Sequence, residues 1–190
     1  MSRRYELKRR AEHQADTGRR IVEATVDLHT SVGPARTTIT AIAEKAGVQR
    51  HTVYAHFPDE RALFHACSNH WRAKHPRPDL GPIVGIEDPA RRLRLALAQM
   101  YAWYESVQHD LALFSRDASL TVAGGETLGE TLEQIALLAD GLARGWPRRK
   151  AVRAAIGHAL AFETWRSLVR AEGLTEKQAV EAMVRFVTSV

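Results

Sequence analysis

The chain has 190 residues, of which 45% are hydrophobic and 26% are charged, an ordinary composition for a soluble globular protein. It contains no apolar run near the ~18 residues that a membrane span needs, and its charged N-terminus is unlike a secretory signal. The single cysteine, Cys67, has no internal partner for a disulfide, so we expect a cytoplasmic protein with no membrane contact.

The formal charge of +5 is confined to the first part of the chain. Residues 1–74 contain 13 Lys and Arg against 8 Asp and Glu, whereas residues 75–190 contain 14 of each kind. A basic N-terminal part joined to a neutral remainder is typical of a polyanion-binding module fused to a second function. A basic solubilising tail would give the same balance, so charge alone does not decide between them.

Residues 1–16 are polar and basic without apolar periodicity, and they predict a flexible arm. Such an arm either follows the minor groove of DNA or stays a solvated tail. From Thr17, apolar residues at helical spacing predict a helix that ends at Gly33. Two short helices follow, within the range 38–57, with a turn between them at Gly47.

A fourth helix begins near residue 58 and leads into the segment 75–82, where three prolines in eight positions prevent a helix. We therefore predict a domain boundary here, with residues 17–74 before it and 75–190 after it. The second part shows one long apolar stripe: Leu93, Leu97, Met100, Tyr104 and Val107. Its predicted elements are a short helix at 111–119, a turn at 122–125, and helices at 127–143, 148–171 and 175–190. Alternating strand patterns do not occur, so the fold class is all-α, with a larger helical domain after a small one.

The segment 38–57 has the pattern of a helix-turn-helix, in which the second helix enters the major groove of DNA. Glycine at position 47 suits a left-handed turn residue, and Val48 fills the gap between the two helices. Val53 and Phe57 lie one turn apart and face the core. The remaining side chains of the second helix are hydrogen-bonding groups on its open faces: Gln49, Arg50, His51, Thr52, Tyr54 and His56.

Residues 17–67 resemble the TetR family of bacterial transcriptional regulators. The resemblance is carried by the runs 20–28, 37–48, 52–58 and 62–64, which match at fixed spacing. It implies a homodimer that binds a double-stranded DNA operator and an effector that binds the later helices. It also implies that Thr38 bonds a phosphate, that Tyr54 and His56 contact the DNA backbone, and that Arg50, His51 and Thr52 face bases.

Three positions depart from the family pattern. Thr40 stands where a long basic residue is frequent, which weakens base reading from the first helix of the motif, although we keep Thr40 among the DNA-binding candidates. Glu60 stands where a lysine usually meets phosphate, with Arg61 one position later, so the phosphate contact at this helix start is in doubt. His29 replaces a core phenylalanine and either loosens the small core or adds a buried hydrogen bond.

Large aromatic side chains are the candidates for an effector pocket, because they bury area and fix orientation. They are Tyr101, Trp103, Tyr104, Phe114, Phe162 and Trp165. The same residues at helical spacing also serve as plain core. His158 and Glu163 lie in an otherwise apolar helix and could meet a polar ligand group, but an ion pair of Glu163 with Arg166 is the simpler interpretation.

The last two helices are the candidates for a dimer interface. Small residues of the first of them would let helices approach closely: Ala151, Ala154, Ala155, Gly157, Ala159 and Ala161. The final helix has an apolar face: Val180, Met183, Val184 and Val187. These faces either pack against a second copy or close the core of their own domain.

Neither a catalytic constellation nor a metal motif occurs, so we expect no enzyme, no cofactor and no metal. The sequence favours a repressor that binds a palindromic operator as a homodimer and is released by a small, largely apolar effector. Two alternatives stay open: a helical small-molecule-binding or enzymatic protein with an incidental basic end, and a nonspecific DNA-binding protein without an effector.

Overall fold

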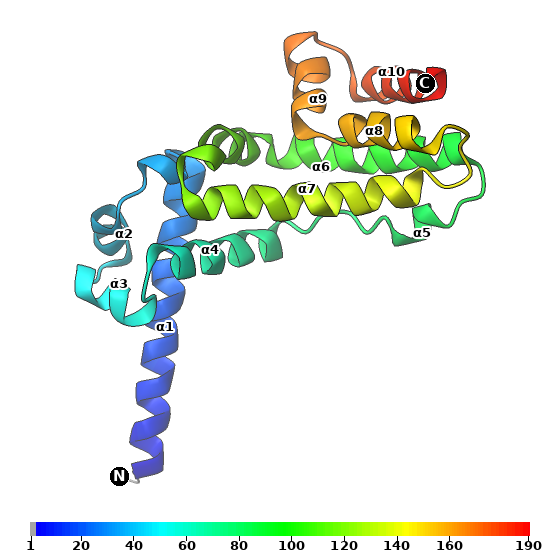
Figure 1. Ribbon diagram of the computed structural model, residues 1–190. Helices are drawn as coiled ribbons and strands as arrows, with labels where there is room; N and C mark the ends of the chain where they lie inside the picture. Colours follow the sequence, from blue (N-terminus) through cyan, green and yellow to red (C-terminus); the bar gives the residue numbers. More distant parts are fainter. Residues whose placement is uncertain (1–2) are drawn as a thin grey trace. The chain divides into compact units, whose positions relative to one another are not determined.

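The computed structural model describes the backbone of residues 3–190 and the side chains of residues 5–190, and every element within these ranges is helical. Figure 1 labels the helices. Their bounds are α1 (Arg3–Ser31), α2 (Ile39–Ala46), α3 (Arg50–His56), α4 (Glu60–Lys74), α5 (Gly81–Val84), α6 (Pro89–Asp117), α7 (Val122–Leu142), α8 (Arg149–Ala159), α9 (Phe162–Arg166) and α10 (Glu176–Ser189). Pro34–Arg36 and Ala118–Leu120 form short 3-10 turns, and Ser167–Ala171 forms a π-helix. The predicted all-α class is confirmed.

None of the helices formed by the described residues combines the length and apolar character that crossing a membrane requires.

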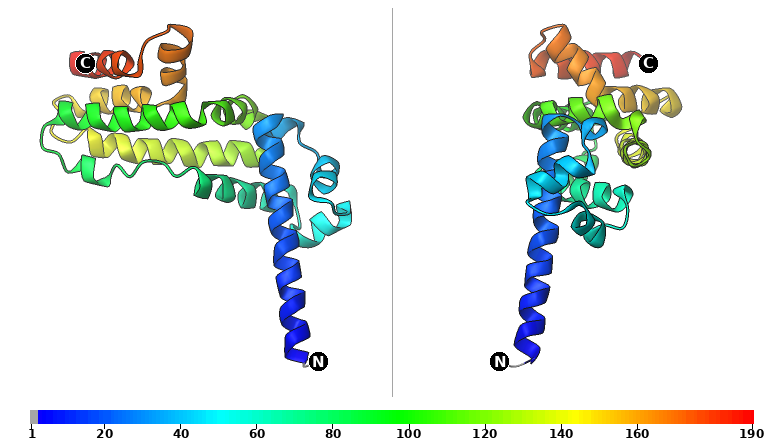
Figure 2. Two further views of the ribbon diagram at one scale, coloured as in Figure 1. Left: turned by 180° about the vertical axis from the view of Figure 1, so that it is seen from behind. Right: turned by 90° about the vertical axis from the view of Figure 1, so that its left-hand side faces the viewer.

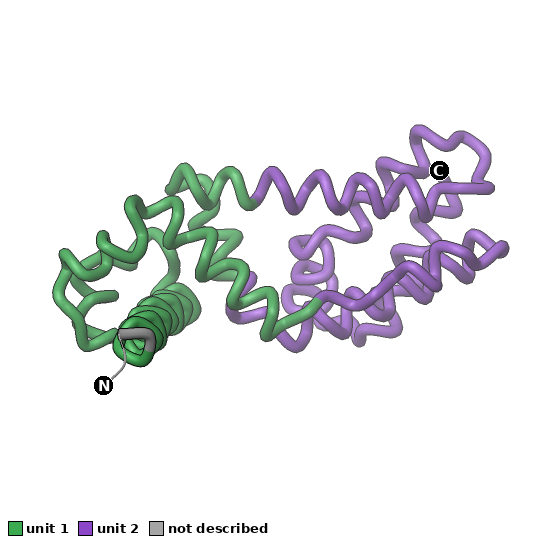
Figure 3. The backbone as a smooth tube through the Cα atoms, turned by 90° about the horizontal axis from the view of Figure 1, so that it is seen from below, with its two compact units in different colours: residues 1–76, 112–127 green, residues 77–111, 128–190 purple. Residues whose placement is uncertain are grey.

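The chain folds as two compact units (Figure 3). The first contains residues 1–76 and 112–127, and the second contains residues 77–111 and 128–190. The sequence pattern predicts a boundary at 74–75 and assigns everything after it to one domain. Segment 112–127 belongs to the first unit instead. A sequence pattern follows chain order and therefore does not predict which distant segments pack together.

The core of the first unit is small and is shared by α1, α2, α3 and α4. Its buried members are Ile21, Ala24, Ile39, Ile42, Ala43, Ala46, Val53 and Leu63. Val48 and Phe57 pack against this cluster while half-buried, as the helix-turn-helix pattern predicts. Burial of each large aliphatic side chain stabilises the fold by about 1.5–3 kcal/mol, so the loss of any one of them would be felt in so small a core.

The core of the second unit forms around α6. The predicted stripe from Leu93 to Val107 is buried at every one of its positions, with at most 5% of any side chain exposed. Arg92 is buried beside this stripe and donates hydrogen bonds to the carbonyls of Leu142, Ile86 and Arg144. A buried guanidinium thus satisfies carbonyl groups at the end of α7, which have no helical partner of their own.

Helix α1 begins at Arg3, whereas the sequence pattern predicts a flexible arm up to residue 16. The first two residues of that arm lie outside the described residues. Residues 5–15 contain neither glycine nor proline and are mostly strong helix formers, and Lys8 pairs with Glu12 across one turn at 3.8 Å. Propagating a helix that is already nucleated is easy for such residues. Periodicity misses it because periodicity detects a buried face, and this segment has none.

The predicted helix 148–171 is interrupted at Leu160 and Ala161, which separate α8 from α9. The interruption releases backbone carbonyls, and side chains satisfy three consecutive ones. Thr164 Oγ1 donates to the His158 carbonyl at 2.7 Å, Tyr101 Oη donates to Ala159 at 2.9 Å, and Tyr104 Oη donates to Leu160 at 2.6 Å. Tertiary hydrogen bonds therefore stabilise a break that an alanine-rich sequence does not predict.

The predicted turn at 122–125 is wrong, because α7 begins at Val122. Gly124 is buried within the helix, where an added Cβ atom would lie 2.8 Å from the Ala118 carbonyl oxygen. Glycine is needed here because two backbone segments approach closely. In the sequence, a glycine of this kind looks the same as a glycine that forms a turn. The predicted short helix at 111–119 is likewise the end of α6.

Candidate nucleic-acid interface and ligand core

The start of α2 is fixed by Thr38, whose side-chain oxygen accepts a hydrogen bond from the Ala41 amide at 3.1 Å. This is an N-cap, which satisfies one of the unpaired amides of a helix start. The side chain is exposed, and its hydroxyl hydrogen is still able to donate to an external acceptor. Capping and phosphate binding are therefore compatible at Thr38.

The turn between α2 and α3 is made by Gly47 in the left-handed conformation, with φ 65° and ψ 40°. Its amide donates to the carbonyls of Ala43 and Glu44, and the Val48 amide donates to Ala43 at 2.9 Å. The backbone thus reverses tightly and α3 follows within three residues. The predicted geometry of this turn is confirmed.

Helix α3 buries Val53, of which 1% is exposed, and presents polar side chains outward. Of the predicted contact residues on α3 and directly before it, Gln49, Arg50, His51 and Tyr54 are exposed, and Thr52 and His56 are half-buried. The predicted contact residue Thr40 lies on α2 and is exposed. Gln49 precedes α3 without using its side chain as a cap, so its amide group remains available. His56 lies beside α1, where an added Cβ atom at Gly18 would be 3.3 Å from His56 Nδ1.

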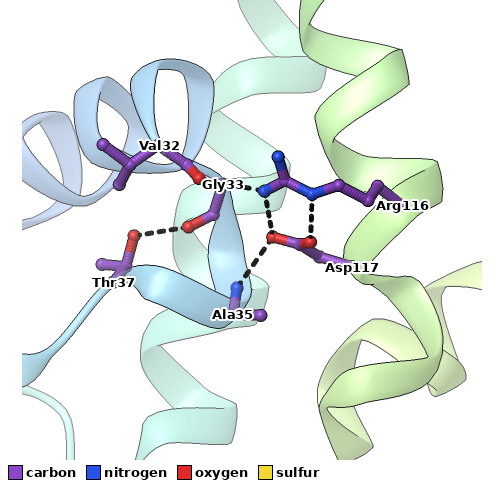
Figure 4. Close-up of polar contacts among 6 residues, drawn as sticks. All are labelled: Val32, Gly33, Ala35, Thr37, Arg116 and Asp117. Carbon is purple, nitrogen blue, oxygen red and sulfur yellow. Dashed lines mark hydrogen bonds and ion pairs between the residues drawn. The ribbon is translucent and has the colours of Figure 1, made fainter.

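The turn that precedes α2 is anchored by the last residues of α6 (Figure 4). Asp117, of which 2% is exposed, accepts a hydrogen bond from the Ala35 amide at 3.0 Å and is bracketed by the Arg116 guanidinium. Arg116 also donates to the Val32 carbonyl at 3.0 Å. Gly33 has φ 96°, and an added Cβ atom would collide with the side chains of both Arg116 and Asp117. Only glycine fits between the turn and this ion pair.

The charge of Asp117 is maintained by its surroundings. The hydrogen bond from Arg116 lowers the pKa of the Asp117 carboxyl below its ordinary value, with further contributions from the Ala35 amide and Arg36, although burial opposes them. Nothing in the sequence pattern indicates this anchor, since Asp117 is 82 positions away from Ala35. An aspartate directly after an arginine is too common to serve as a signal.

His29 is buried in the first unit between Phe64, at 5.5 Å between ring centroids, and Cys67, whose Sγ lies 3.5 Å from Nδ1. Of the two interpretations of this departure, the structure favours the buried polar contact. Burial lowers the pKa of His29 to about 4 and raises the pKa of the Cys67 thiol to about 12. Both groups are therefore neutral at pH 7.

The start of α4 contains Glu60, another of the three departures from the family pattern. Asp59 caps this helix by accepting from the Ala62 amide at 2.7 Å. Glu60 is exposed, and Arg61 is ion-paired with Glu126 at 2.9 Å. An arginine engaged by a carboxylate is less available to phosphate than a lysine in open solvent.

Five of the six aromatic pocket candidates belong to the core cluster of the second unit. Tyr101, Tyr104 and Trp165 are buried, with 0%, 3% and 0% exposed, and Phe162 stacks on Trp165 at 5.6 Å. Trp103 lies 5.4 Å from Tyr104 and is half-buried. Phe114 is elsewhere: it contacts Trp71 edge-on at 5.3 Å within the first unit. The structure thus brings together all the candidates except Phe114.

Sequence reasoning missed several buried polar groups. His70 Nε2 and Thr127 Oγ1 in the first unit, and Trp165 Nε1 in the second, have no hydrogen-bond partner in the described part of the chain. Buried groups of this kind are costly unless a partner is provided. Burial, which no sequence motif encodes, is the only signal that identifies them. By contrast, Glu163 pairs with Arg166 at 2.6 Å, as the simpler interpretation predicts.

The predicted dimer faces are divided by the structure. Ala155, Ala159, Val180, Val184 and Val187 are buried in the core of their own unit. Other candidates are not fully buried: Ala151 and Ala154 are exposed, and Gly157, Ala161 and Met183 are half-buried. The outer face of α8 also carries His158, whose ring lies 6.1 Å from that of Phe186 on α10.

A capped α2, a left-handed glycine turn and an α3 that buries Val53 and exposes polar side chains form a helix-turn-helix, the arrangement whose second helix enters the major groove in DNA-binding proteins of this kind. The model of the family described as "Bacterial regulatory proteins, tetR family" matches residues 21–67. Residues 21–67, which contain the helix-turn-helix, are thus similar to the DNA-binding domain of bacterial transcriptional regulators of this family.

Individual proteins are similar to this chain either in part of the sequence or in the fold. The HTH-type transcriptional regulator Rv2250c of Mycobacterium tuberculosis is 44% identical over 50 residues, which is 26% of this chain. The chain matches only 26% of that relative's own length. A TetR-like transcriptional regulator from Rhodococcus sp. RHA1 has a similar fold, with TM-score 0.64 and 18% identity over 90% of this chain and 93% of that one. The multidrug binding protein EbrR, solved in complex with imidazole, gives TM-score 0.59 and 20% identity over 97% of this chain and 93% of its own.

Proposed function

We propose that the chain is a transcriptional repressor that binds a palindromic operator as a homodimer and is released by a small, largely apolar effector. The observation that carries the proposal is the surface of α3, where Gln49, Arg50, His51 and Tyr54 are exposed above a buried Val53. Arginine can donate two hydrogen bonds to guanine, and glutamine can pair with adenine. Thr38 and His56 would contact the DNA backbone.

Two arguments support the homodimer: the affinity that operator binding requires, and an exposed face on α8 and α10. A single small helix-turn-helix reads few base pairs, so useful affinity requires two half-sites about 34–36 Å apart. The face that would pair includes Ala151 and Ala154 of α8 and Phe186 of α10, of which 42% is exposed. At Gly157 no atom lies within 4 Å of an added Cβ, so this part of α8 is open to a close partner helix.

The effector is proposed from the aromatic core of the second unit. The rings around Tyr104 and Trp165 offer apolar area, and the buried Nε1 of Trp165 offers a hydrogen-bond donor to a ligand acceptor. The complex of the multidrug binding protein EbrR with imidazole supports small-molecule binding in a protein of similar fold. Release would follow if the effector binds better to a conformation in which the two α3 helices are wrongly spaced, because the two affinities are coupled reciprocally.

The test is binding of the full chain to fragments of its own genomic neighbourhood, in excess random competitor and at fixed salt. The proposal predicts selective retention of a fragment that contains an inverted repeat, with two chains bound per site. Equal affinity for every duplex would support the nonspecific DNA-binding alternative instead. Absence of binding to any duplex, at low salt and with the folded chain, would favour the small-molecule-binding or enzymatic alternative.

A further inference from the structure

Helix α1 continues well beyond the helices it packs against. Thr17 and Ile21 are 6% and 0% exposed, whereas every side chain from Tyr5 to Ala15 is exposed. Gly18 marks the crossing point, because it lies against His56 at the end of α3. Figures 1 and 2 show the preceding part of α1 projecting past α2, α3 and α4 in all three views. We call residues 3–16 the α1 extension; at 1.5 Å per residue it is roughly 21 Å long.

The α1 extension has two different faces. At about 100° per residue, Leu7, Arg10 and Gln14 continue the face that Thr17 and Ile21 bury against the helix-turn-helix. The opposite face carries Lys8, which pairs with Glu12 at 3.8 Å. Asp16 also lies away from the first face and pairs with Arg19 and Arg20.

Glu6 is the acidic side chain that lies near the face of Arg10 in the α1 extension. Glu6 is about 40° from Arg10 in projection down the helix. None of the ion pairs among the side chains of residues 5–190 joins them. Glu6 also lies in the first turn of α1, where a carboxylate interacts favourably with the helix N-terminus. The guanidinium of Arg10 is thus exposed on the face of α1 that, further along the helix, packs against the helix-turn-helix.

A helical extension cannot do what a flexible arm does. An α-helix with its side chains is about 10–12 Å across, whereas the minor groove of B-DNA is about 6 Å wide. The α1 extension is therefore too thick to follow the minor groove. A helix that projects past the recognition helix would lie along the outside of the duplex, where phosphates are the accessible groups.

We propose that the α1 extension binds the phosphates of duplex DNA that flanks the operator, outside the two half-sites, through Arg10. This inference rests on the proposed function, because it requires α3 to be seated on DNA. The contact carries no base preference and adds affinity and register. It also adds salt dependence, since each phosphate contact contributes about 0.9 to the slope of log K against log salt.

The test compares Arg10→Ala with Lys8→Ala, two variants that remove one positive charge from opposite faces of the same exposed turn. Binding of the full chain is measured from 50 to 200 mM salt on the recovered operator with ten flanking base pairs on each side. Arg10→Ala should lower the slope by about 0.9 per bound chain, or about 1.8 for the dimer, so that wild-type affinity for the operator falls about 12-fold more than that of the variant over this range. Lys8→Ala should match the wild type. On a duplex cut to the two half-sites, all three proteins should be equal.

A third variant tests whether the helical form matters. Ala11→Pro interrupts the exposed extension and leaves the buried part of α1 in place, so thermal unfolding should change little. It should lose the same part of the slope as Arg10→Ala. The inference would be overturned if Arg10→Ala and Ala11→Pro both had the wild-type slope, or if Arg10→Ala and Lys8→Ala lost the slope equally. In either case, specific operator binding by the wild type would still uphold the proposed function. Failure of the wild type to select any operator would overturn the proposed function itself.

Discussion

The two regions with candidate functional residues, α3 and the aromatic core of the second unit, differ in whether those side chains are exposed or buried. In α3 the functional candidates are at the surface, and a single valine, Val53, holds the helix to the core. In the second unit the candidates Tyr101, Tyr104 and Trp165 are the core, and the two tyrosines also satisfy carbonyls at the break between α8 and α9.

This difference separates function from stability in one region and joins them in the other. Substitutions at the exposed positions of α3 should change binding with little change in folding, because those side chains lie outside the core. Substitutions in the aromatic core should change folding first, whatever they do to an effector. Four substitutions either break this contrast or sharpen it, and their expected effects decrease in size from one to the next.

The largest effect is expected for Trp165→Ala. Removing a fully buried indole should lower the free energy of unfolding by about 3–5 kcal/mol, since the lost burial is accompanied by a cavity. Denaturant unfolding followed by circular dichroism measures it. The half-buried Trp103→Ala is the control and should cost less. A Trp165→Ala protein of normal stability would mean that the fold does not depend on this indole.

The next effect depends on pH. The pKa of His29 is about 4 in the folded chain and has its ordinary value of about 6.5 in the unfolded one, so the unfolded state binds more protons between these values. Stability should therefore decrease as pH falls from 6.5 to 4, by about 3 kcal/mol from this residue. His29→Phe should remove that decrease, which unfolding curves at pH 7 and pH 4 measure. His51→Ala, on the surface of α3, should leave it intact, and identical pH profiles for the His29 variant and the wild type would refute the assignment.

Arg50→Ala tests the surface region. It should weaken operator binding by about 1–3 kcal/mol, most strongly for sites that contain the base pair Arg50 reads, and change the free energy of unfolding by less than about 0.5 kcal/mol. Binding to the operator and to single-base variants of it provides the measurement. An equal loss on all duplexes would assign Arg50 to phosphate. A large loss of stability would break the contrast between the two regions.

The smallest effect is expected for Tyr104→Phe, which removes the donor to the Leu160 carbonyl and little else. The free energy of unfolding should decrease by about 1 kcal/mol. Tyr54→Phe, which removes a hydroxyl from the exposed face of α3, is the matched control and should leave stability unchanged. If the two variants were equally stable, the break between α8 and α9 would not depend on this tyrosine.

Much of the first unit could be predicted because its pattern is local. The turn at Gly47, the burial of Val53 and the position of α3 follow from neighbours within a few residues. The long stripe of α6 could also be predicted, since periodicity reports a buried face directly. The individual DNA contacts and the pocket remain predictions.

The differences arise where distant groups decide the conformation. Gly124 has the pattern of a turn residue and is a close backbone contact, and Leu160 has the pattern of a helix and is a break stabilised by tyrosines from α6. Phe114 has the composition of a pocket residue but packs on Trp71 in the other unit. The α1 extension was missed for the opposite reason, because an exposed helix has no periodic face to detect.

The hydrogen bond between Asp117 and the Ala35 amide cannot form until late in synthesis of the chain. The ribosome adds about 5–20 residues per second, so Asp117 is synthesised roughly 4–16 seconds after Ala35. During that interval the helices α1 to α4 exist as nascent chain without the carboxylate that fixes the turn before α2. A fragment ending at residue 76 would be left permanently at this stage, and shortening the chain to its DNA-binding motif would remove part of what holds the motif in place.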